Sequence, residues 1–333
     1  MEWAAASASA PVSARACGCA INVATRMDMS GSSPIRAVLL AGPTASGKSA
    51  LALRIAEEWG GSIVNADSMQ VYADLREVTA RPSEADEQRV PHRLYGHVNG
   101  ANAYSVGAWL RDMQPLIEGA EGPLVIVGGT GLYFTALTEG LAEVPPTADD
   151  VRARWRVEAR DQPSERLWRE LYARDPRSAE VLAPTDRQRI VRSLEVLEST
   201  GRPIADWPQA QPLLPFGSPV VPIILMPERD VLRSRIEQRF TGIVDGDGVA
   251  EVEALLKRDL DVDLPVMRAI GVREIAAMLR GEIDRERAVE LAVTATRQYA
   301  KRQRTWFRNR FGHEWRRVVD MPSALRLIRQ QDA

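Results

Sequence analysis

One segment constrains the fold of this chain more than any other: a short apolar run that leads directly into a glycine-rich loop. Residues 37–41 have the composition of a buried strand, and residues 49–59 carry apolar side chains at helical spacing. Between them, residues 42–49 read Gly-Pro-Thr-Ala-Ser-Gly-Lys-Ser and match the pattern G-x-x-x-x-G-K-S. In this strand-to-helix context the pattern predicts a loop whose backbone N–H groups hold phosphate oxygens.

The residue types of this loop each have a part in phosphate binding. Glycines let the backbone approach the phosphate, Lys48 adds a full positive charge, and the Ser49 hydroxyl is a ligand for Mg²⁺ bridging the same phosphates. We therefore predict a diphosphate- or nucleotide-binding loop, with Ser49 as its metal ligand. The loop consists of Gly42, Pro43, Thr44, Ala45, Ser46, Gly47, Lys48 and Ser49.

Strands and helices alternate beyond this loop. The sequence predicts strands at residues 62–66, 124–127 and 220–225, and a helix over residues 106–117. This alternation predicts an α/β fold with a doubly wound parallel sheet of the P-loop NTPase type. Further helices are predicted near the C-terminus, over residues 230–240, 248–257, 266–280 and 285–309.

Changes of pattern divide the chain into three parts. Residues 1–35 are rich in alanine and serine without periodicity, so we predict a disordered N-terminal extension. Residues 147–215 carry charged amphipathic helices broken by prolines, which predict an inserted helical domain. Residues 36–146 and 216–333 together form the predicted catalytic core with its C-terminal helices.

Composition excludes several classes of protein. The chain has 45% apolar and 26% charged residues, as globular proteins do, and its net charge is -2. It has no apolar run near the roughly 20 residues of a membrane helix, so we expect no membrane span. Only two cysteines occur, Cys17 and Cys19, which favours a reducing compartment, and we expect the cytoplasm.

The loop alone leaves its phosphate compound open. NTPases pair such a loop with an acid placed after a run of apolar residues, where it completes magnesium coordination. Here the apolar residues 124–127 are followed by Gly128-Gly129-Thr130-Gly131. Asp67, which follows the strand at residues 62–66, could replace that acid. A kinase or NTPase acting on a nucleotide or RNA therefore stays open as an alternative.

Several blocks in a fixed order identify a family. The chain resembles the bacterial tRNA dimethylallyltransferases, which transfer a dimethylallyl group from dimethylallyl diphosphate to N6 of adenosine 37 in tRNAs that read codons beginning with U, and release diphosphate. The matching blocks are residues 42–49, Asp-Ser-Met-Gln-Val-Tyr at 67–72, Pro-His-Arg-Leu at 91–94, Gly-Gly-Thr-Gly-Leu-Tyr at 128–133, Asp-Arg-Gln-Arg at 186–189, Arg-Ala-Ile-Gly at 268–271 and Thr-Arg-Gln-Tyr-Ala-Lys-Arg-Gln at 296–303.

The resemblance implies roles for two catalytic residues. It makes Asp67 the general base that takes a proton from the adenine amine, although a magnesium ligand or a helix N-cap are alternative roles for this carboxylate. It makes Thr130 a stabiliser of the leaving oxygen, with a helix cap as the alternative. Mg²⁺ is the implied cofactor.

The resemblance also implies a partner, the tRNA anticodon stem-loop, bound by a protein that we expect to be a monomer. A non-enzymatic RNA-binding module would explain these basic residues but would leave the phosphate loop and Asp67 without a role. The implied tRNA-binding residues are Asp67, Ser68, Met69, Gln70, Thr130, Arg152, Gln188, Arg189, Ile190, Val191, Arg192, Arg268, Gly271, Arg273, Arg297, Lys301 and Arg304.

The helix predicted at residues 285–309 adds an independent signal for RNA. Its cations at positions 297, 301, 304 and 308 recur at helical spacing, which places them on one face and predicts phosphate contacts. The aromatic residues Trp306, Phe307 and Trp315 fit either base stacking or core packing, and we expect core packing.

Two departures from the family pattern stand out. Residues 73–82 lack the glycines usual in the family there, which leaves the shape of this loop open. His313 has no cysteine partners nearby, so the zinc finger of eukaryotic relatives is absent from this stretch.

Overall fold

The computed structural model describes residues 35–217 and 219–331, so the predicted extension lies outside the described residues except for Ile35. Within the described part, a six-stranded parallel sheet has the strand order β3-β2-β4-β1-β5-β6. The predicted α/β class with a parallel sheet is confirmed. The strands are β1 (Ala37–Ala41), β2 (Ser62–Asn65), β3 (His92–Arg93), β4 (Leu124–Gly128), β5 (Val220–Leu225) and β6 (Arg316–Val318).

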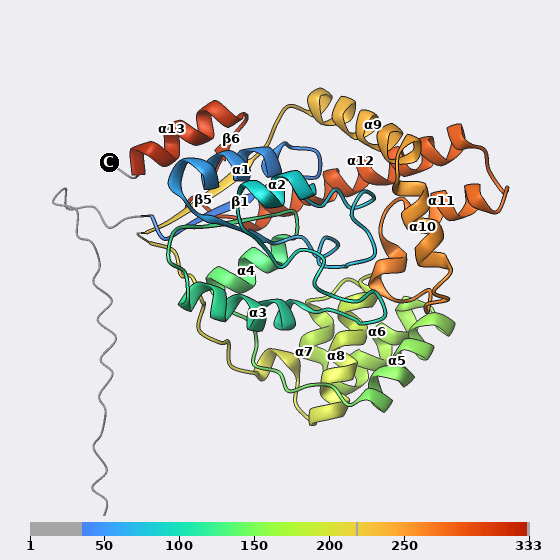
Figure 1. The fold of residues 1–333 in the computed structure, drawn as a ribbon. Coiled ribbons are helices and arrows are strands. Elements are labelled where there is room, and N and C mark those ends of the chain that lie inside the picture. The colour runs from blue at the N-terminus through green and yellow to red at the C-terminus, as the bar shows by residue number, and fades with distance from the viewer. Residues whose placement is uncertain (1–34, 218, 332–333) are drawn as a thin grey trace, which may run out of the picture.

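Helices cover both faces of this sheet (Figure 1). Alternate residues of β1 point to opposite faces: Leu39 packs with the α3 and α4 layer, whereas Val38 and Leu40 pack with α1 and α13. Both faces of the sheet are therefore covered and shielded from water, which explains why the strands have continuous apolar sequences. The four covering helices are α1 (Lys48–Trp59), α3 (Val106–Glu118), α4 (Gly131–Glu139) and α13 (Met321–Gln331).

The strand order determines where ligands can bind. β1 lies between β4 and β5, and because all strands are parallel, the segments after β1, β2 and β4 leave the sheet at one edge. The chain crosses β4 to reach β2 and later returns, so the topology switches direction beside β1, where open α/β sheets bind ligands. The phosphate loop, Asp67 and Thr130 all lie at this edge.

The middle of the chain forms a lobe of helices, coloured green to yellow in Figure 1. These helices pack around a core of their own that includes Trp155, Leu171, Ile190 and Leu194. This separate core supports our proposal that residues 147–215 are an inserted domain. The lobe comprises α5 (Asp149–Asp161), α6 (Ser164–Arg174), α7 (Pro176–Glu180), α8 (Arg187–Thr200) and the 3-10 turn η1 (Ile204–Asp206).

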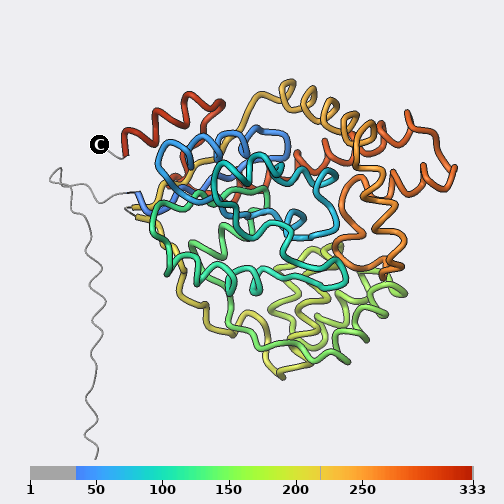
Figure 2. Tube along the Cα trace, viewed as in Figure 1, coloured from blue at the N-terminus to red at the C-terminus, as the bar shows by residue number. Residues whose placement is uncertain are grey.

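The C-terminal helices pack beside the sheet, and the tube in Figure 2 shows the long α12 running from their far end back toward it. The helix predicted over residues 266–280 is wrong as a continuous element. It is broken at Gly271, whose φ is +107° and whose lack of a side chain accommodates the Phe240 ring. The elements are α9 (Arg229–Asp245), α10 (Gly248–Leu256), the 3-10 turn η2 (Pro265–Arg268), α11 (Val272–Leu279) and α12 (Arg285–Arg310).

Several short elements escaped the sequence patterns. Besides α4 and α13, these are α2 (Glu84–Arg89), β3 and β6. Strands β3 and β6 span two and three residues and contain charged side chains, so no alternation is visible. None of the helices in the described residues is both long and apolar enough to cross a membrane.

The loop at residues 73–82, where the chain departs from the family pattern, is held by one carboxylate. Glu251 of α10 accepts hydrogen bonds from the backbone N–H groups of Arg76, Glu77 and Val78 at 2.8, 2.8 and 3.1 Å. We expect Glu251→Ala to lower the free energy of unfolding by about 2 kcal/mol, because three donors lose a charged acceptor. Urea unfolding would measure this change.

The same helix offers a matched control. Glu253 is exposed and forms a surface ion pair with Lys257 at 2.9 Å. Glu253→Ala should cost less than about 0.5 kcal/mol. Equal effects of the two substitutions would contradict the role of Glu251.

Candidate active site

The phosphate loop adopts a conformation that only some residues tolerate. Gly47 and Ala45 have φ values of +91° and +63°, the left-handed region that costs a residue with a side chain. A Cβ at Gly42 would lie 2.8 Å from the carbonyl oxygen of Leu225. This tight turn brings the start of α1 to the sheet edge, where its free N–H groups favour an anion.

Two arginines of α9, which the sequence reasoning missed, contact the loop. Arg235 donates to the carbonyl oxygen of Ser46 at 3.0 Å, and Arg239 donates to the Thr44 hydroxyl at 3.0 Å. Arg239 also donates to the Val78 carbonyl at 3.3 Å. Their i, i+4 spacing beside the apolar face of α9 is the one sequence signal that could have found them.

The Lys48 ammonium lies in the same region and folds back to the Pro43 carbonyl, 3.4 Å away. Burial lowers the pKa of Lys48 from 10.5 to about 8; Asp67 opposes this shift, and Arg239 adds to it. Lys48 and Arg239 are thus two cations that both contact the loop and repel each other, and Asp67 is an anion that attracts Lys48. A diphosphate would relieve this repulsion and favour the charged form of Lys48.

Asp67 is held in a tight turn just after β2. Its Oδ1 accepts from the backbone N–H of Met69 at 3.0 Å, and its own N–H donates to the side-chain oxygen of Asn65 at 2.8 Å. Asn65 is fully buried and also donates to the carbonyl oxygens of Asp67 and Leu94 at 2.9 and 3.0 Å. Asn65 thus fixes the direction of Asp67, and sequence reasoning missed this support.

Thr130 follows β4 and lies beside the Asp67 turn. It occupies the N-cap position of α4, but its hydroxyl makes no capping bond. Instead, the hydroxyl accepts from the Ser68 N–H at 3.0 Å and lies 3.2 Å from the Ser68 hydroxyl. The cap alternative for this side chain is therefore wrong, and Thr130 is part of the surroundings of Asp67.

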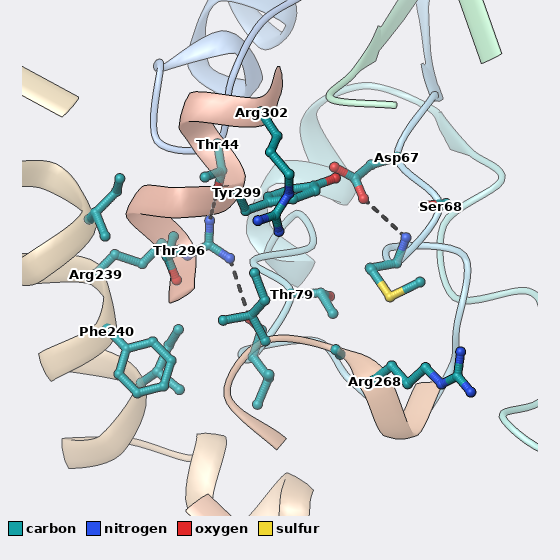
Figure 3. A pocket seen from close by; sticks show the side chains of 16 residues that line it. Thr44, Asp67, Ser68, Thr79, Arg239, Phe240, Arg268, Thr296, Tyr299 and Arg302 are labelled. Atoms are coloured by element: carbon teal, nitrogen blue, oxygen red, sulfur yellow. Dashed lines mark hydrogen bonds between the residues drawn. The ribbon is translucent and has the colours of Figure 1, made fainter. Parts of the chain in front are cut away.

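A cavity of about 310 Å³ opens between these groups. Figure 3 shows Thr44, Asp67 and Arg239 around it, with Tyr299 and Arg302 above and Phe240 and Arg268 below. Burial and the nearby Asp67 raise the pKa of Tyr299, so this residue stays a neutral phenol. The cavity thus has a polar end at the phosphate loop and an apolar wall, formed by Val78, Ile236, Phe240, Ile243 and Ile270.

The turn after β4 has no space for the acid that an NTPase places there. A Cβ at Gly128 would lie 2.0 Å from the Ala66 carbonyl oxygen, and one at Gly129 would lie 2.2 Å from the Gln303 amide nitrogen. Among the residues that line the cavity in the described part of the chain, Asp67 is the acidic one. The site therefore offers one carboxylate beside one phosphate loop.

A second hollow, a surface groove of about 760 Å³, lies along α12. Among the described residues that line the groove there are several cations and no acidic side chain, so the groove can bind a polyanion. Arg302 lines both the groove and the cavity, so the two are neighbours on either side of this side chain. The groove is lined by Arg189, Gln298, Lys301, Arg302, Thr305, Trp306, Asn309 and Arg310.

The family of this chain follows from direct comparison. The model of the IPP transferase family matches residues 70–310, and that of the isopentenyl transferase family matches residues 35–99. A protein named tRNA dimethylallyltransferase from Allorhizobium ampelinum is 53% identical over 286 residues, which cover 85% of this chain and 94% of that protein. The chain belongs to the tRNA dimethylallyltransferase family.

Further relatives agree with this membership. A tRNA dimethylallyltransferase from Agrobacterium fabrum is 51% identical over 286 residues, covering 85% of this chain and 96% of that protein. The crystal structure of a tRNA isopentenylpyrophosphate transferase from Bacillus halodurans superposes with a TM-score of 0.62 at 28% identity, covering 89% of this chain and 96% of that one. Both sequence and fold thus support the family.

The structure brings only part of the expected tRNA-binding residues together. Ser68, Met69 and Arg268 line the cavity beside Asp67, and Arg189 and Lys301 meet in the groove. Gln70 instead donates to the carbonyl oxygens of Thr79 and Ala80, at 2.9 and 2.8 Å. Gln188 and Arg273 are exposed and Arg152 is half-buried, and none of the three lines either hollow. Arg192 donates to Thr147 at 2.6 Å, and Gly271 is buried.

Some of these residues face elsewhere. Ile190 is fully buried in the core of the inserted lobe and Val191 packs against that core, which corrects the expectation that their side chains contact RNA. Arg297 pairs with Glu237 of α9 at 3.2 Å, and Arg304 donates to the Pro227 carbonyl at 2.8 Å. Of the expected stripe of cations on α12, only Lys301 therefore lines the groove, while Arg308 is exposed outside it.

Core packing was expected for all three aromatic residues near the end of α12, and it is confirmed for two of them. Phe307 and Trp315 are buried, and Trp315 stacks on Phe311 at a ring distance of 4.0 Å. Trp306 is half-buried, lines the groove and packs over Gly131, where a Cβ would lie 2.2 Å from its ring. Of the three, Trp306 is thus the one within reach of a ligand.

The donors present fit a magnesium ion that is shared with a ligand. The described residues contain no group of three or more histidine, cysteine or acidic side chains able to hold a metal. Ser49 is exposed at the start of α1, directly after Lys48. Mg²⁺ characteristically takes one or two protein ligands together with phosphate oxygens and water, so Ser49 and a bound diphosphate match its needs.

Proposed function

We propose that the chain transfers a dimethylallyl group from dimethylallyl diphosphate to N6 of adenosine 37 of tRNA and releases diphosphate. One observation carries this proposal: Asp67 and Thr44 of the phosphate loop line the same cavity, together with cationic side chains such as Arg239 and an apolar patch around Phe240. The polar end suits a diphosphate and the apolar wall suits a five-carbon chain. Asp67 lies where a proton acceptor for the attacking amine is needed.

In this reaction the leaving group departs into the phosphate loop. The C–O bond breaks and the diphosphate takes both electrons, so negative charge grows on the oxygen that bridged carbon and phosphorus. Lys48, Arg239 and the loop N–H groups are fixed before the reaction and stabilise that charge. A divalent metal, which we propose to be Mg²⁺ held by Ser49, would neutralise further charge on the diphosphate.

The acceptor approaches from the side of Asp67. As N6 forms its bond to the allylic carbon, it loses a proton to the Asp67 carboxylate. Within the described part of the chain, this carboxylate accepts one hydrogen bond, from Met69. The Ser68–Thr130 pair fixes the turn that carries Asp67. Adenosine 37 must leave its stack to enter the cavity, at a cost of a few kcal/mol, which contacts to the rest of the RNA have to offset.

The groove along α12 supports tRNA rather than a free nucleotide as acceptor. Its cations can bind several phosphates, and Arg302 lines both the groove and the cavity. We propose that the anticodon stem-loop lies between this groove and the lobe of residues 147–215. A single chain supplies the loop, the base and the groove, so we propose a monomer as the active unit, acting in the cytoplasm where tRNA is available.

One experiment tests the function. Purified protein is incubated with Mg²⁺, radiolabelled dimethylallyl diphosphate and either AMP or a tRNA with adenosine at position 37 and on both sides of it. We expect label in the tRNA and none in AMP. Label in AMP alone would replace tRNA by a nucleotide as acceptor, and turnover of ATP without any label transfer would favour the kinase or NTPase alternative.

A further inference from the structure

Gln303 of α12 is a buried polar side chain that joins two segments of the active site. It is only 5% exposed. Its side-chain oxygen accepts from the backbone N–H of Thr44 in the phosphate loop at 2.9 Å, and its amide nitrogen donates to the carbonyl oxygen of Gly129 at 2.9 Å. One amide therefore spans from the leaving-group loop to the turn that follows β4.

The Gly129 end of this link lies directly behind the proposed base. A Cβ at Gly129 would be 2.2 Å from the Gln303 amide nitrogen and 3.2 Å from Oδ2 of Asp67. The next residue is Thr130, whose hydroxyl is bonded to Ser68 beside Asp67. The glycine thus allows the amide to approach, and the position of the Asp67 turn depends on that of residues 129–130.

We propose that Gln303 is a positioning residue, which sets the separation between the phosphate loop that holds the diphosphate and the turn that supports Asp67 and Thr130. The proposal rests on the proposed function. The transferred carbon must lie between the two segments, and misplacement by about 1 Å can cost a hundredfold in rate. Both hydrogen bonds are buried, where a fixed amide restrains the backbone more strongly than water would.

Glutamine suits this link because it carries one acceptor and one donor at the same end. A methionine has a similar length but neither group, so Gln303→Met removes both bonds while the volume is kept. A glutamate keeps the acceptor for Thr44, but its ionised form lacks the donor for Gly129. When protonated, the introduced carboxyl regains a donor.

Steady-state kinetics with labelled dimethylallyl diphosphate and tRNA test the proposal. We expect Gln303→Met to lower kcat about thirtyfold or more, while KM for both substrates stays within about threefold of the wild type. The residues that bind the substrates are retained, but the phosphate loop and the Asp67 turn are no longer held at the correct separation. For Gln303→Glu we expect a smaller loss that shrinks, relative to the wild type, between about pH 8 and about pH 6. Gln114→Met, on the exposed side of α3, is the control without effect.

The outcomes separate this inference from the proposed function. If the wild type transfers no label, the function itself fails. If the wild type is active and both Gln303 variants keep kcat within about threefold, or lose only substrate affinity, the positioning role is overturned. Should Gln303→Met fail to fold, Gln303→Glu still decides, since a loss of kcat that does not ease at lower pH contradicts the role of the donor.

Discussion

Replacing Asp67 by asparagine is expected to lower kcat about a thousandfold, while tRNA affinity stays within about threefold of the wild type. Asparagine has the same shape, and its side-chain oxygen can still accept from the Met69 N–H, so the turn after β2 is retained. What is lost is the basicity needed to take the proton from N6. Single-turnover transfer to tRNA and a separate tRNA-binding titration would measure the two effects.

The same variant distinguishes the base from the alternative role of a magnesium ligand. If Asp67 mainly held the metal, raising the Mg²⁺ concentration would recover a large part of the activity, because the weaker site could be filled by mass action. Loss of a base is not repaired by metal. Asp112→Asn is a suitable control, since Asp112 bonds to Tyr104 and lines neither the cavity nor the groove. Activity of the Asp67 variant near that of the wild type would exclude the base.

The sequence predicted those parts of the site that follow strands directly. The phosphate loop, Asp67 and Thr130 each come right after a buried apolar run, and parallel strands bring their ends to one edge. The predictions of these strands are confirmed. The roles of the three groups in catalysis stay predictions, because they depend on a substrate rather than on the fold.

The supporting residues could not be predicted in this way. Arg239 and Gln303 reach the loop from positions 195 and 259 residues later in the chain. Nothing in α9 separates Arg239 from the exposed Arg233 except its place beside the apolar face, and that difference matters only after the helix is packed. The role of Asn65 could not be predicted either, because the hydrogen-bond partners of a buried asparagine at the end of a strand are known only from the tertiary structure.

Replacing Lys48 is the second change with a large expected effect: it should weaken diphosphate binding but raise the stability of the ligand-free protein. We expect Lys48→Met to weaken dimethylallyl diphosphate binding about a hundredfold, because the positive charge of Lys48 that attracts the diphosphate is lost. Without ligand, however, the same substitution should stabilise the protein. Burial lowers the pKa of Lys48 from 10.5 in the unfolded chain to about 8, so at neutral pH the fold holds a charged lysine at a cost.

The sign of this effect depends on pH in a defined window. Between about pH 8 and pH 10.5 the unfolded chain binds more protons than the folded one at this residue, so the stability of the wild type rises with pH there. Below this window Lys48→Met should be more stable by about 2 kcal/mol, less than the full shift implies because part of the side chain remains accessible to water. Above it the advantage should vanish.

Urea unfolding of the ligand-free protein at several pH values, together with titration of donor binding, would check both halves of this prediction. A control at Lys257, an exposed lysine on α10, should change neither stability nor binding when replaced by methionine. A variant of Lys48 that is less stable at neutral pH would show that its charge is already compensated in the free protein. The neighbouring Asp67 would then be the compensating group, and the two residues would form a pair that the diphosphate has to separate.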